Sequence, residues 1–187
     1  MDVTTWYLEQ TDPSALRPAG SVPTPVTRAE VVSPELNRFL YTSVGGDWYW
    51  IDRLGWTWRQ WLDRLDRPGV ETWVAMVQGT PAGYVELDGG VPDGEVELAY
   101  FGLLPAFVGK GLGGHLLTEG IRRAWGLADR WPGHAPTRRV WVHTCSTDGP
   151  AALANYRARG MRLYRTEQVT VELPAVPPGP WPGAGRG

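Results

Sequence analysis

A cluster of glycines between an apolar segment and a helical pattern constrains the fold most. The segment FVGKGLGGHLL (residues 107–117) places four glycines within six positions, although glycine costs about 0.5–1 kcal/mol relative to alanine in regular structure. Apolar residues recur at helical spacing over 116–128, and residues 95–104 before the cluster are rich in strand formers. The glycines therefore mark a strand-to-helix junction, where unpaired amides and the helix dipole favour an anion, most naturally phosphate.

The rest of the chain alternates strand and helix patterns around this junction. Strands are predicted at residues 3–10, 72–78, 82–88, 95–104, 138–145 and 161–173, with a short turn at 79–81. Helices are predicted at residues 33–44, 56–65, 111–128 and 150–159. The first has Ser33 as its cap and Pro34 in its first position, and Gly160 ends the last. This order predicts an α/β (α+β) fold in which helices flank a central mixed sheet of six to seven strands.

Length and charge limit the classes of protein that the chain can belong to. Its 187 residues, 42% of them apolar, and its net charge of −2 predict one soluble domain over 1–174, followed by a flexible Pro/Gly-rich tail at 175–187. No apolar stretch is long enough for a membrane span, and no basic run indicates nucleic-acid binding. The single Cys145 and the lack of a signal-peptide pattern predict a cytoplasmic protein.

Two other phosphate-binding motifs are poorer explanations of the glycine cluster. Gly109, Gly111 and Gly114 formally satisfy the dinucleotide fingerprint GxGxxG. That fingerprint opens a six-stranded fold, for which too few residues remain, and its acidic residue should end the next strand, whereas Asp129 precedes it. The Walker pattern is excluded because no Gly-Lys-Ser or Gly-Lys-Thr occurs in the chain.

The segments LLPAFVGKGLGGHLL and PAALANYRARGM resemble the GNAT superfamily of acetyl-CoA-dependent N-acyltransferases. The family motif is Arg or Gln, two residues, Gly, one residue, then Gly or Ala, and Gly111 and Gly113 fill its two small positions. Tyr156, four residues before Gly160, matches the distal signature. The resemblance covers about residues 71–170, and residues 1–70 agree only in the order of elements. Two positions depart from the family: Val108 replaces the Arg or Gln, and Gly149 replaces a common Asn.

The resemblance implies a GNAT-like sheet that splays between its fourth and fifth strands, with the pantetheine arm of acetyl-CoA inserted there as an added strand. Backbone amides provide most of the phosphate contacts in this family, and Lys110 could supply the charge missing at Val108. No metal is expected. The residues assigned to acetyl-CoA binding are Leu103, Leu104, Val108, Gly109, Lys110, Gly111, Gly113 and Gly114.

The resemblance also implies which residues carry the chemistry. Glu97, eight residues before Pro105, is at a position where the family often keeps a carboxylate base, and Tyr156 would protonate the departing thiolate. An amide near Leu103 would stabilise the charge that develops on the thioester oxygen. Glu95, His143 and water remain alternative bases. Cys145 has no legible His-Asp partners, which argues against a nucleophile.

Six of the 11 tryptophans lie within residues 48–73. Trp58 falls off the helical face that Leu54, Trp61 and Leu65 define, so these tryptophans cannot all be buried in one core. In the family, this region lines the acceptor site, and aromatic walls suit an aromatic, hydrophobic or cationic amine. The predicted function is N-acetyl transfer from acyl-CoA to a small amine, and the alternative is a non-catalytic CoA-binding sensor or interaction module. A homodimer is left open.

Overall fold

The computed structural model describes residues 1–90 and 94–184 and contains one mixed sheet of seven strands. The strands run in the order β2-β3-β4-β5-β6-β1-β7, and β5 and β6 are the parallel pair among the described strands. The strands are β1 (Asp2–Gln10), β2 (Val26–Arg28), β3 (Val70–Val77), β4 (Thr80–Asp88), β5 (Glu95–Leu103), β6 (Arg139–Cys145) and β7 (Arg162–Thr170). The helices are α1 (Pro34–Gly45), α2 (Trp58–Leu65), α3 (Leu112–Trp125) and α4 (Ala152–Ala158), with short 3-10 turns η1 (Pro13–Ala15) and η2 (Pro105–Phe107).

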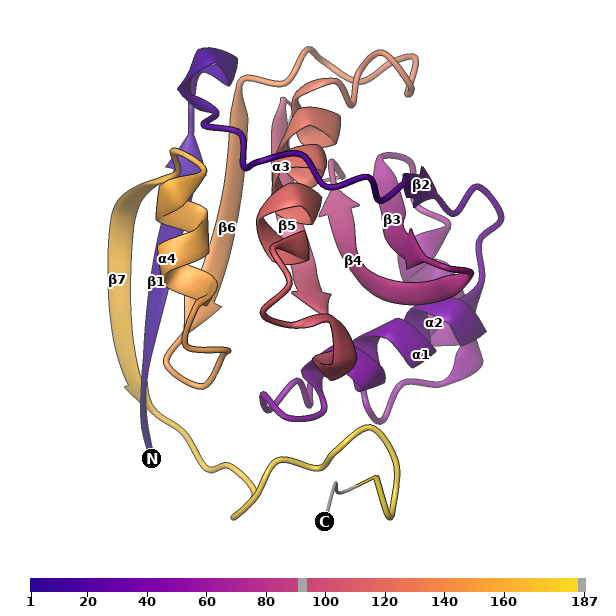
Figure 1. Cartoon of the computed structure of the whole chain (residues 1–187), viewed down its shortest axis with the longest axis vertical. Coiled ribbons are helices and arrows are strands. Elements are labelled where there is room, and N and C mark those ends of the chain that lie inside the picture. The colour runs from indigo at the N-terminus through magenta and orange to yellow at the C-terminus, as the bar shows by residue number, and fades with distance from the viewer. Residues whose placement is uncertain (91–93, 185–187) are drawn as a thin grey trace.

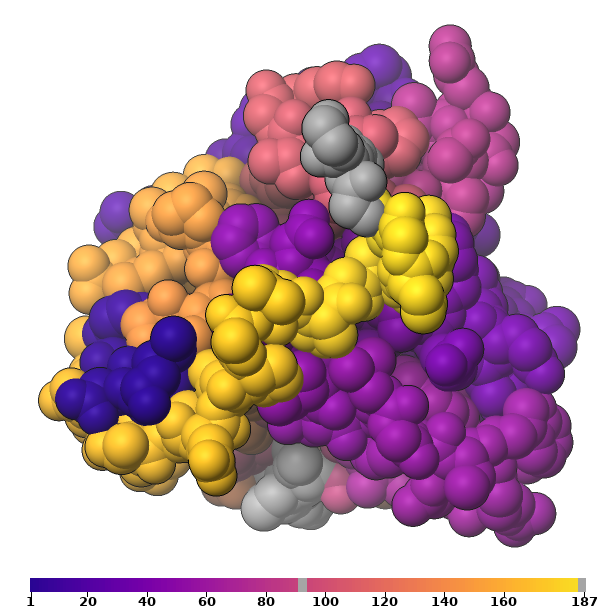
Figure 2. Space-filling view, turned by 90° about the horizontal axis from the view of Figure 1, so that it is seen from below, coloured from indigo at the N-terminus to yellow at the C-terminus, as the bar shows by residue number. Residues whose placement is uncertain are grey.

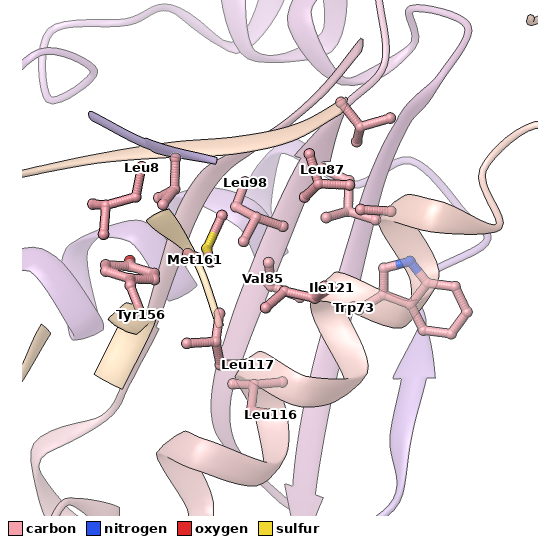
Figure 3. Packing of buried hydrophobic residues seen from close by; sticks show 14 of the residues in the cluster. Leu8, Trp73, Val85, Leu87, Leu98, Leu116, Leu117, Ile121, Tyr156 and Met161 are labelled. Atoms are coloured by element: carbon pink, nitrogen blue, oxygen red, sulfur yellow. The ribbon is translucent and has the colours of Figure 1, made fainter. Parts of the chain in front are cut away.

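The helices lie on both faces of the sheet (Figure 1). Helices α3 and α4 cover one face and bury the main hydrophobic core, in which Leu116, Leu117 and Ile121 of α3 meet the inward side chains of the central strands (Figure 3). Helices α1 and α2 cover part of the opposite face, where Leu40 and Trp61 belong to two smaller clusters. The predicted architecture, a mixed sheet of six to seven strands with flanking helices, is confirmed, and the sheet has seven strands.

Local capping explains where the first two helices begin. Ser33 accepts a hydrogen bond from the amide of Leu36 at 3.1 Å, and Pro34 occupies the first helical position, as predicted. Helix α2 begins at Trp58, two residues later than predicted, because Thr57 and Gln60 form a capping box.

Two other predictions of local structure need correction. Strand β2 was missed because its three residues are too few to show an alternating pattern, and it forms by pairing with β3. The β3–β4 turn lies one residue earlier than predicted, because Val77 pairs with Thr80. Gln78 and Gly79 form the two-residue connection, and both have positive φ, which is typical of a tight hairpin.

Strands β5 and β6 separate after a short parallel ladder. Pairing joins Glu95, Val96 and Glu97 to Arg139, Val140 and Trp141, whereas β5 continues to Leu103 and β6 to Cys145. The two arrows diverge toward their C-terminal ends in Figure 1. This splay is the one expected between the fourth and fifth strands of the predicted sheet, which are β5 and β6 once β2 is counted.

The segment after β7 crosses the end of the molecule at which β5 and β6 diverge (Figures 1 and 2). The amide of Gly179 donates to the carbonyl of Gly46 at 3.0 Å, at the C-terminal end of α1. Gly46 must be small here, because a Cβ would lie 2.6 Å from the nitrogen of Pro180. Gly179 and Pro180 of the predicted tail therefore contact the domain, and 185–187 lie outside the described residues. The flexibility of the tail stays a prediction.

Residues 1–90 and 94–184 show neither a membrane-spanning helix nor a cluster of metal ligands. No helix among them combines the length and the apolar character needed to cross a membrane. The same residues contain no group of three or more His, Cys, Asp or Glu side chains arranged to hold a metal ion.

Candidate active site

The glycine loop leaves open space in front of the N-terminus of α3. Gly109 and Gly111 have φ values of +81° and +77°, a region that favours glycine, and a Cβ on either would meet no atom within 4 Å. Gly111 is the N-cap residue and makes no side-chain cap, so the first amides of the helix are left without a side-chain acceptor. A Cβ on Gly113 would make only ordinary contacts, at 3.6 Å from Leu103 Cδ1 and 3.8 Å from Asn155 Nδ2. Geometry and chemistry here fit the phosphates of a nucleotide cofactor.

An arginine that the sequence analysis did not select approaches the same helix end. A Cβ on Gly114 would lie 2.6 Å from Nη1 of Arg159 and 2.9 Å from the Cβ of Ala19, so glycine permits this close approach. A guanidinium at the positive end of a helix dipole is unfavourable alone and becomes favourable when an anion lies nearby. Arg159 therefore adds a second reason to expect an anion at the loop.

The two side chains expected to contact phosphate are exposed. Val108 follows η2 and is 62% exposed, so the family's Arg or Gln position points no charge into the loop here. Lys110 is also exposed and lies with its Nζ 5.7 Å from the ring centroid of Phe107. The exposure of Val108 and Lys110 does not test whether these residues contact acetyl-CoA, as predicted.

The free edge of β5 faces the splay. Leu104 donates its amide to the carbonyl of Ala82 on β4 at 2.9 Å, so that amide is already used within the sheet. Because successive amides of a strand point to opposite edges, the amide of Leu103 is directed to the β6 side. The amide predicted to face a thioester oxygen therefore has the required direction, whereas Leu104 could contact a cofactor only through other atoms.

Glu97 and His143 meet where the strands separate. Glu97 is the last β5 residue paired with β6, and His143 lies two residues beyond its partner Trp141. Nδ1 of His143 is 3.3 Å from Oε1 of Glu97, and the side chains are 48% and 15% exposed, respectively. The hydrogen bond to Glu97 raises the pKa of His143, against the lowering effect of burial. The structure thus joins two residues that the sequence analysis treated as alternatives.

Tyr156 projects from α4 into the core below the splay. It is 5% exposed, and its ring packs edge-on against Phe101 of β5 with centroids 5.9 Å apart. Figure 3 shows the ring beside Leu8 and Met161. Burial raises the pKa of Tyr156, and Asp148 and Cys145 add to this effect, so the hydroxyl is protonated at neutral pH.

The loop between α1 and α2 is tied to the loop after β6. Nε1 of Trp50 donates to Oδ1 of Asp148 at 3.3 Å, while Oδ2 of Asp148 accepts from the amide of Cys145 at 2.9 Å. The ring of Trp48 lies 3.6 Å from where Gly149 would carry a Cβ. Gly149, one of the departures from the family motif, thus lies against Trp48, and a Cβ there would make only ordinary contacts with this ring.

A buried arginine of the same α1–α2 loop, Arg53, connects this loop to strand β4. Arg53 binds Glu86 of β4 through two hydrogen bonds of 2.9 and 3.0 Å, and its guanidinium lies 4.3 Å from the ring centroid of Tyr100. Trp61 is 1% exposed and Trp58 56% exposed, which confirms that the tryptophans of this region are not buried together. A role of the cluster in lining the acceptor site stays a prediction.

The other residues weighed as catalytic groups have structural partners. Glu95 accepts a hydrogen bond from Nη1 of Arg139 at 2.9 Å, which ties its carboxylate to the sheet. Sγ of Cys145 lies 3.0 Å from Oγ1 of Thr147, and burial raises the pKa of the thiol, which disfavours the thiolate. Asp148 was not selected from the sequence, because its partner Trp50 becomes a neighbour only in the fold.

A splayed sheet edge beside an open helix N-terminus is the arrangement that the resemblance to the GNAT superfamily implied. The sequence model of the acetyltransferase (GNAT) family matches residues 35–161. The chain therefore belongs to the GNAT acetyltransferase family. No curated protein sequence gives a significant match.

Solved structures with the same fold are distant in sequence. A GCN5-related N-acetyltransferase from Kribbella flavida is 21% identical, with a TM-score of 0.59 over 87% of this chain and 55% of that one. A putative GNAT acetyltransferase from Novosphingobium aromaticivorans is 14% identical, with a TM-score of 0.57 over 90% and 63%. A conserved protein of unknown function from Staphylococcus epidermidis is 16% identical, with a TM-score of 0.59 over 90% and 60%. The chain thus spans 55–63% of the length of these three proteins, and they establish the fold alone.

Proposed function

We propose that the protein transfers an acetyl group from acetyl-CoA to the amine of a small molecule. The observation that carries the proposal is the splay, which leaves the edge of β5 free beside the Glu97–His143 pair, while Tyr156 packs against Phe101 of β5 from the core. The glycine loop and Arg159 lie beside α3, where they suit the phosphates of the donor. Membership of the GNAT family supports the acyltransferase class.

Each group at the opening has a distinct part in this reaction. The amide of Leu103 donates to the thioester oxygen and stabilises the negative charge that develops there. The Glu97–His143 pair provides the site that accepts a proton from the amine. The protonated hydroxyl of Tyr156 donates toward the departing sulfur. The amides at the start of α3 hold the phosphates and so fix the position of the reacting group.

The charges around the opening favour a cationic or aromatic acceptor. The charges of Asp148 and Asp52 raise the pKa of His143 in the same direction as Glu97, so the negative charge of three carboxylates acts on this side chain. Trp50 and Trp48 lie beside them in the α1–α2 loop. A protonated amine is attracted to such carboxylates and can also bind the faces of aromatic rings.

The proposal is tested by measuring binding and turnover separately. Acetyl-CoA is titrated into the purified protein by calorimetry, and release of CoA thiol is then followed with tryptamine, phenethylamine, spermidine and lysine methyl ester. Binding with acetylation of at least one amine is the expected result. Binding without thiol release from any amine would favour the CoA-binding module, and no binding would contradict both functions.

Val108→Arg is expected to tighten acetyl-CoA binding by about 1 kcal/mol, near the low end for a charge-assisted hydrogen bond in a wet site. Val108 is 62% exposed, so the arginine has room and needs no repacking. The measurement is calorimetry at low and high salt, because the gain should shrink as salt screens the charge. Val176→Arg, at another exposed valine, is the control for nonspecific charge. Weaker binding by Val108→Arg would show that Val108 itself contacts the cofactor.

A further inference from the structure

We propose that Nε2 of His143 is the atom that takes the proton from the acceptor amine, and that Glu97 is the residue that positions His143. This inference rests on the proposed acetyl transfer and specifies its base. It differs from the expectation of a direct carboxylate base, because here Glu97 does not contact the amine.

The position of the pair follows from the strand register. The parallel ladder ends with Glu97 opposite Trp141, so every residue of β6 after Trp141 borders the opening. Side chains alternate along a strand, which places His143 on the same face as Trp141, two residues further into the splay. The 3.3 Å approach of Glu97 Oε1 to His143 Nδ1 shows that both side chains share this face. Of the two, the histidine lies deeper in the opening.

Glu97 and His143 differ in the atoms that face each other and in exposure, and this difference assigns the base to His143 and the positioning role to Glu97. Nδ1 of His143 faces Glu97, so the carboxylate favours the tautomer with its proton on Nδ1 and leaves the lone pair on Nε2. The Glu97 side chain is 15% exposed, whereas the His143 side chain is 48% exposed. An acceptor molecule can therefore reach the imidazole more readily than the carboxylate. This is the arrangement by which a carboxylate orients a histidine base in other group-transfer enzymes.

The surroundings of His143 suit a base near neutral pH. It contacts Glu97 of β5, and the rings of Tyr7 on β1 and Trp141 on β6 lie 6.0 and 6.3 Å away between centroids. The charges of Asp52 in the α1–α2 loop and Asp148 after β6 also act on it. The carboxylates raise the pKa of His143 above its ordinary value, with burial opposing them. His143 accepts a proton only when neutral, so the rate should rise as pH increases through this raised pKa.

The proton balance of the step is complete. An acceptor that arrives protonated first loses one proton to water, because only the neutral nitrogen can attack the thioester carbonyl. As the N–C bond forms and the C–S bond breaks, Nε2 of His143 takes the second proton that the nitrogen loses. Tyr156 supplies a proton to the sulfur, and both side chains return to their resting states by exchange with water. No oxidant, reductant or metal takes part.

Two variants distinguish this assignment from a direct Glu97 base. His143→Gln should lower kcat/KM at neutral pH by about 10²-fold, within the range for loss of a general base, and should move the acidic limb of the pH–rate profile to higher pH, where the amine is neutral without help. Glu97→Gln removes the charge that raises the pKa of His143, so its acidic limb should move to lower pH. If Glu97 were the direct base, Glu97→Gln would instead move the limb to higher pH, where the amine is neutral without help.

Nuclear magnetic resonance gives a readout that does not depend on turnover. The chain has three histidines, so His115→Gln, His134→Gln and His143→Gln assign the ring signals one by one. His143 is expected to titrate above the ordinary histidine pKa in the wild-type protein and lower in Glu97→Gln. His134→Gln is the activity control, because that ring packs against Trp131 with centroids 6.2 Å apart.

The outcomes distinguish failure of the histidine base from failure of the proposed acetyl transfer. Wild-type turnover combined with an unchanged profile in His143→Gln would overturn the histidine base and leave acetyl transfer standing. An upward shift of the limb in Glu97→Gln, or a His143 titration that Glu97→Gln does not lower, would also overturn it. A wild-type protein that binds acetyl-CoA and acetylates none of the amines would overturn the proposed function, and the base assignment with it.

Discussion

Gly113→Val is expected to weaken acetyl-CoA binding about 10²-fold, because two charge-assisted hydrogen bonds of about 1.5 kcal/mol each would be lost at the start of α3. Gly113 has no positive φ, and a Cβ there would lie beside Leu103 of β5 and Asn155 of α4, in the first turn of α3 after the open space at Gly111. A valine side chain would fill the volume where phosphate meets the amides. Calorimetric titration with acetyl-CoA measures the loss.

Gly113 is a sharper test than Gly111. Gly111 has a φ of +77°, so valine there would strain the backbone as well as block the site. Gly113→Ala should give a smaller loss than Gly113→Val, because its Cβ makes only ordinary contacts. Gly55→Val is the control, since a Cβ at Gly55 meets nothing within 4 Å and lies in the α1–α2 connection. Unchanged affinity in a folded Gly113→Val protein would remove the loop from the cofactor site.

Structural features that depend on a few neighbouring residues were predicted well from the sequence. The start of α1 depends on Ser33 and Pro34, which act on amides within one helical turn. The strand-to-helix junction depends on Gly109 and Gly111, whose left-handed backbone is a local property of glycine. By contrast, β2 has only three residues and depends on β3 for its hydrogen bonds, so no local pattern revealed it.

Contacts between distant segments could not be predicted in the same way. Trp50 and Asp148 form a hydrogen bond although 98 positions separate them, and this bond connects the two loops at the end of the splay. Arg159 follows α4 in the sequence, yet it approaches Gly114 of α3. Glu97 and His143 were each candidates for the base, but their 3.3 Å contact depends on the parallel register of β5 and β6.

Tyr156→Phe is expected to lower kcat by about 10²-fold, the lower end of the range for general acid catalysis, with little change in acetyl-CoA affinity. The lower end applies because burial raises the pKa of Tyr156, which makes proton transfer to a thiolate less favourable. The ring remains packed against Phe101, so the core should keep its shape. Steady-state release of CoA thiol measures kcat, and calorimetry measures the affinity.

The pH dependence of Tyr156→Phe distinguishes catalysis from structure. The hydroxyl of Tyr156 is protonated throughout a range of about pH 6 to 9, so the ratio of variant to wild-type kcat should be flat across it. Tyr84→Phe is the matched control, because Tyr84 is 1% exposed and burial also raises its pKa, but it lies on β4 under α1. Each variant is expected to lose about 1 kcal/mol of unfolding free energy at most, the usual value of one hydrogen bond. If Tyr156→Phe keeps the wild-type kcat, Tyr156 only packs in the core and does not take part in catalysis. If both variants lose kcat equally, the loss comes from disturbance of the core.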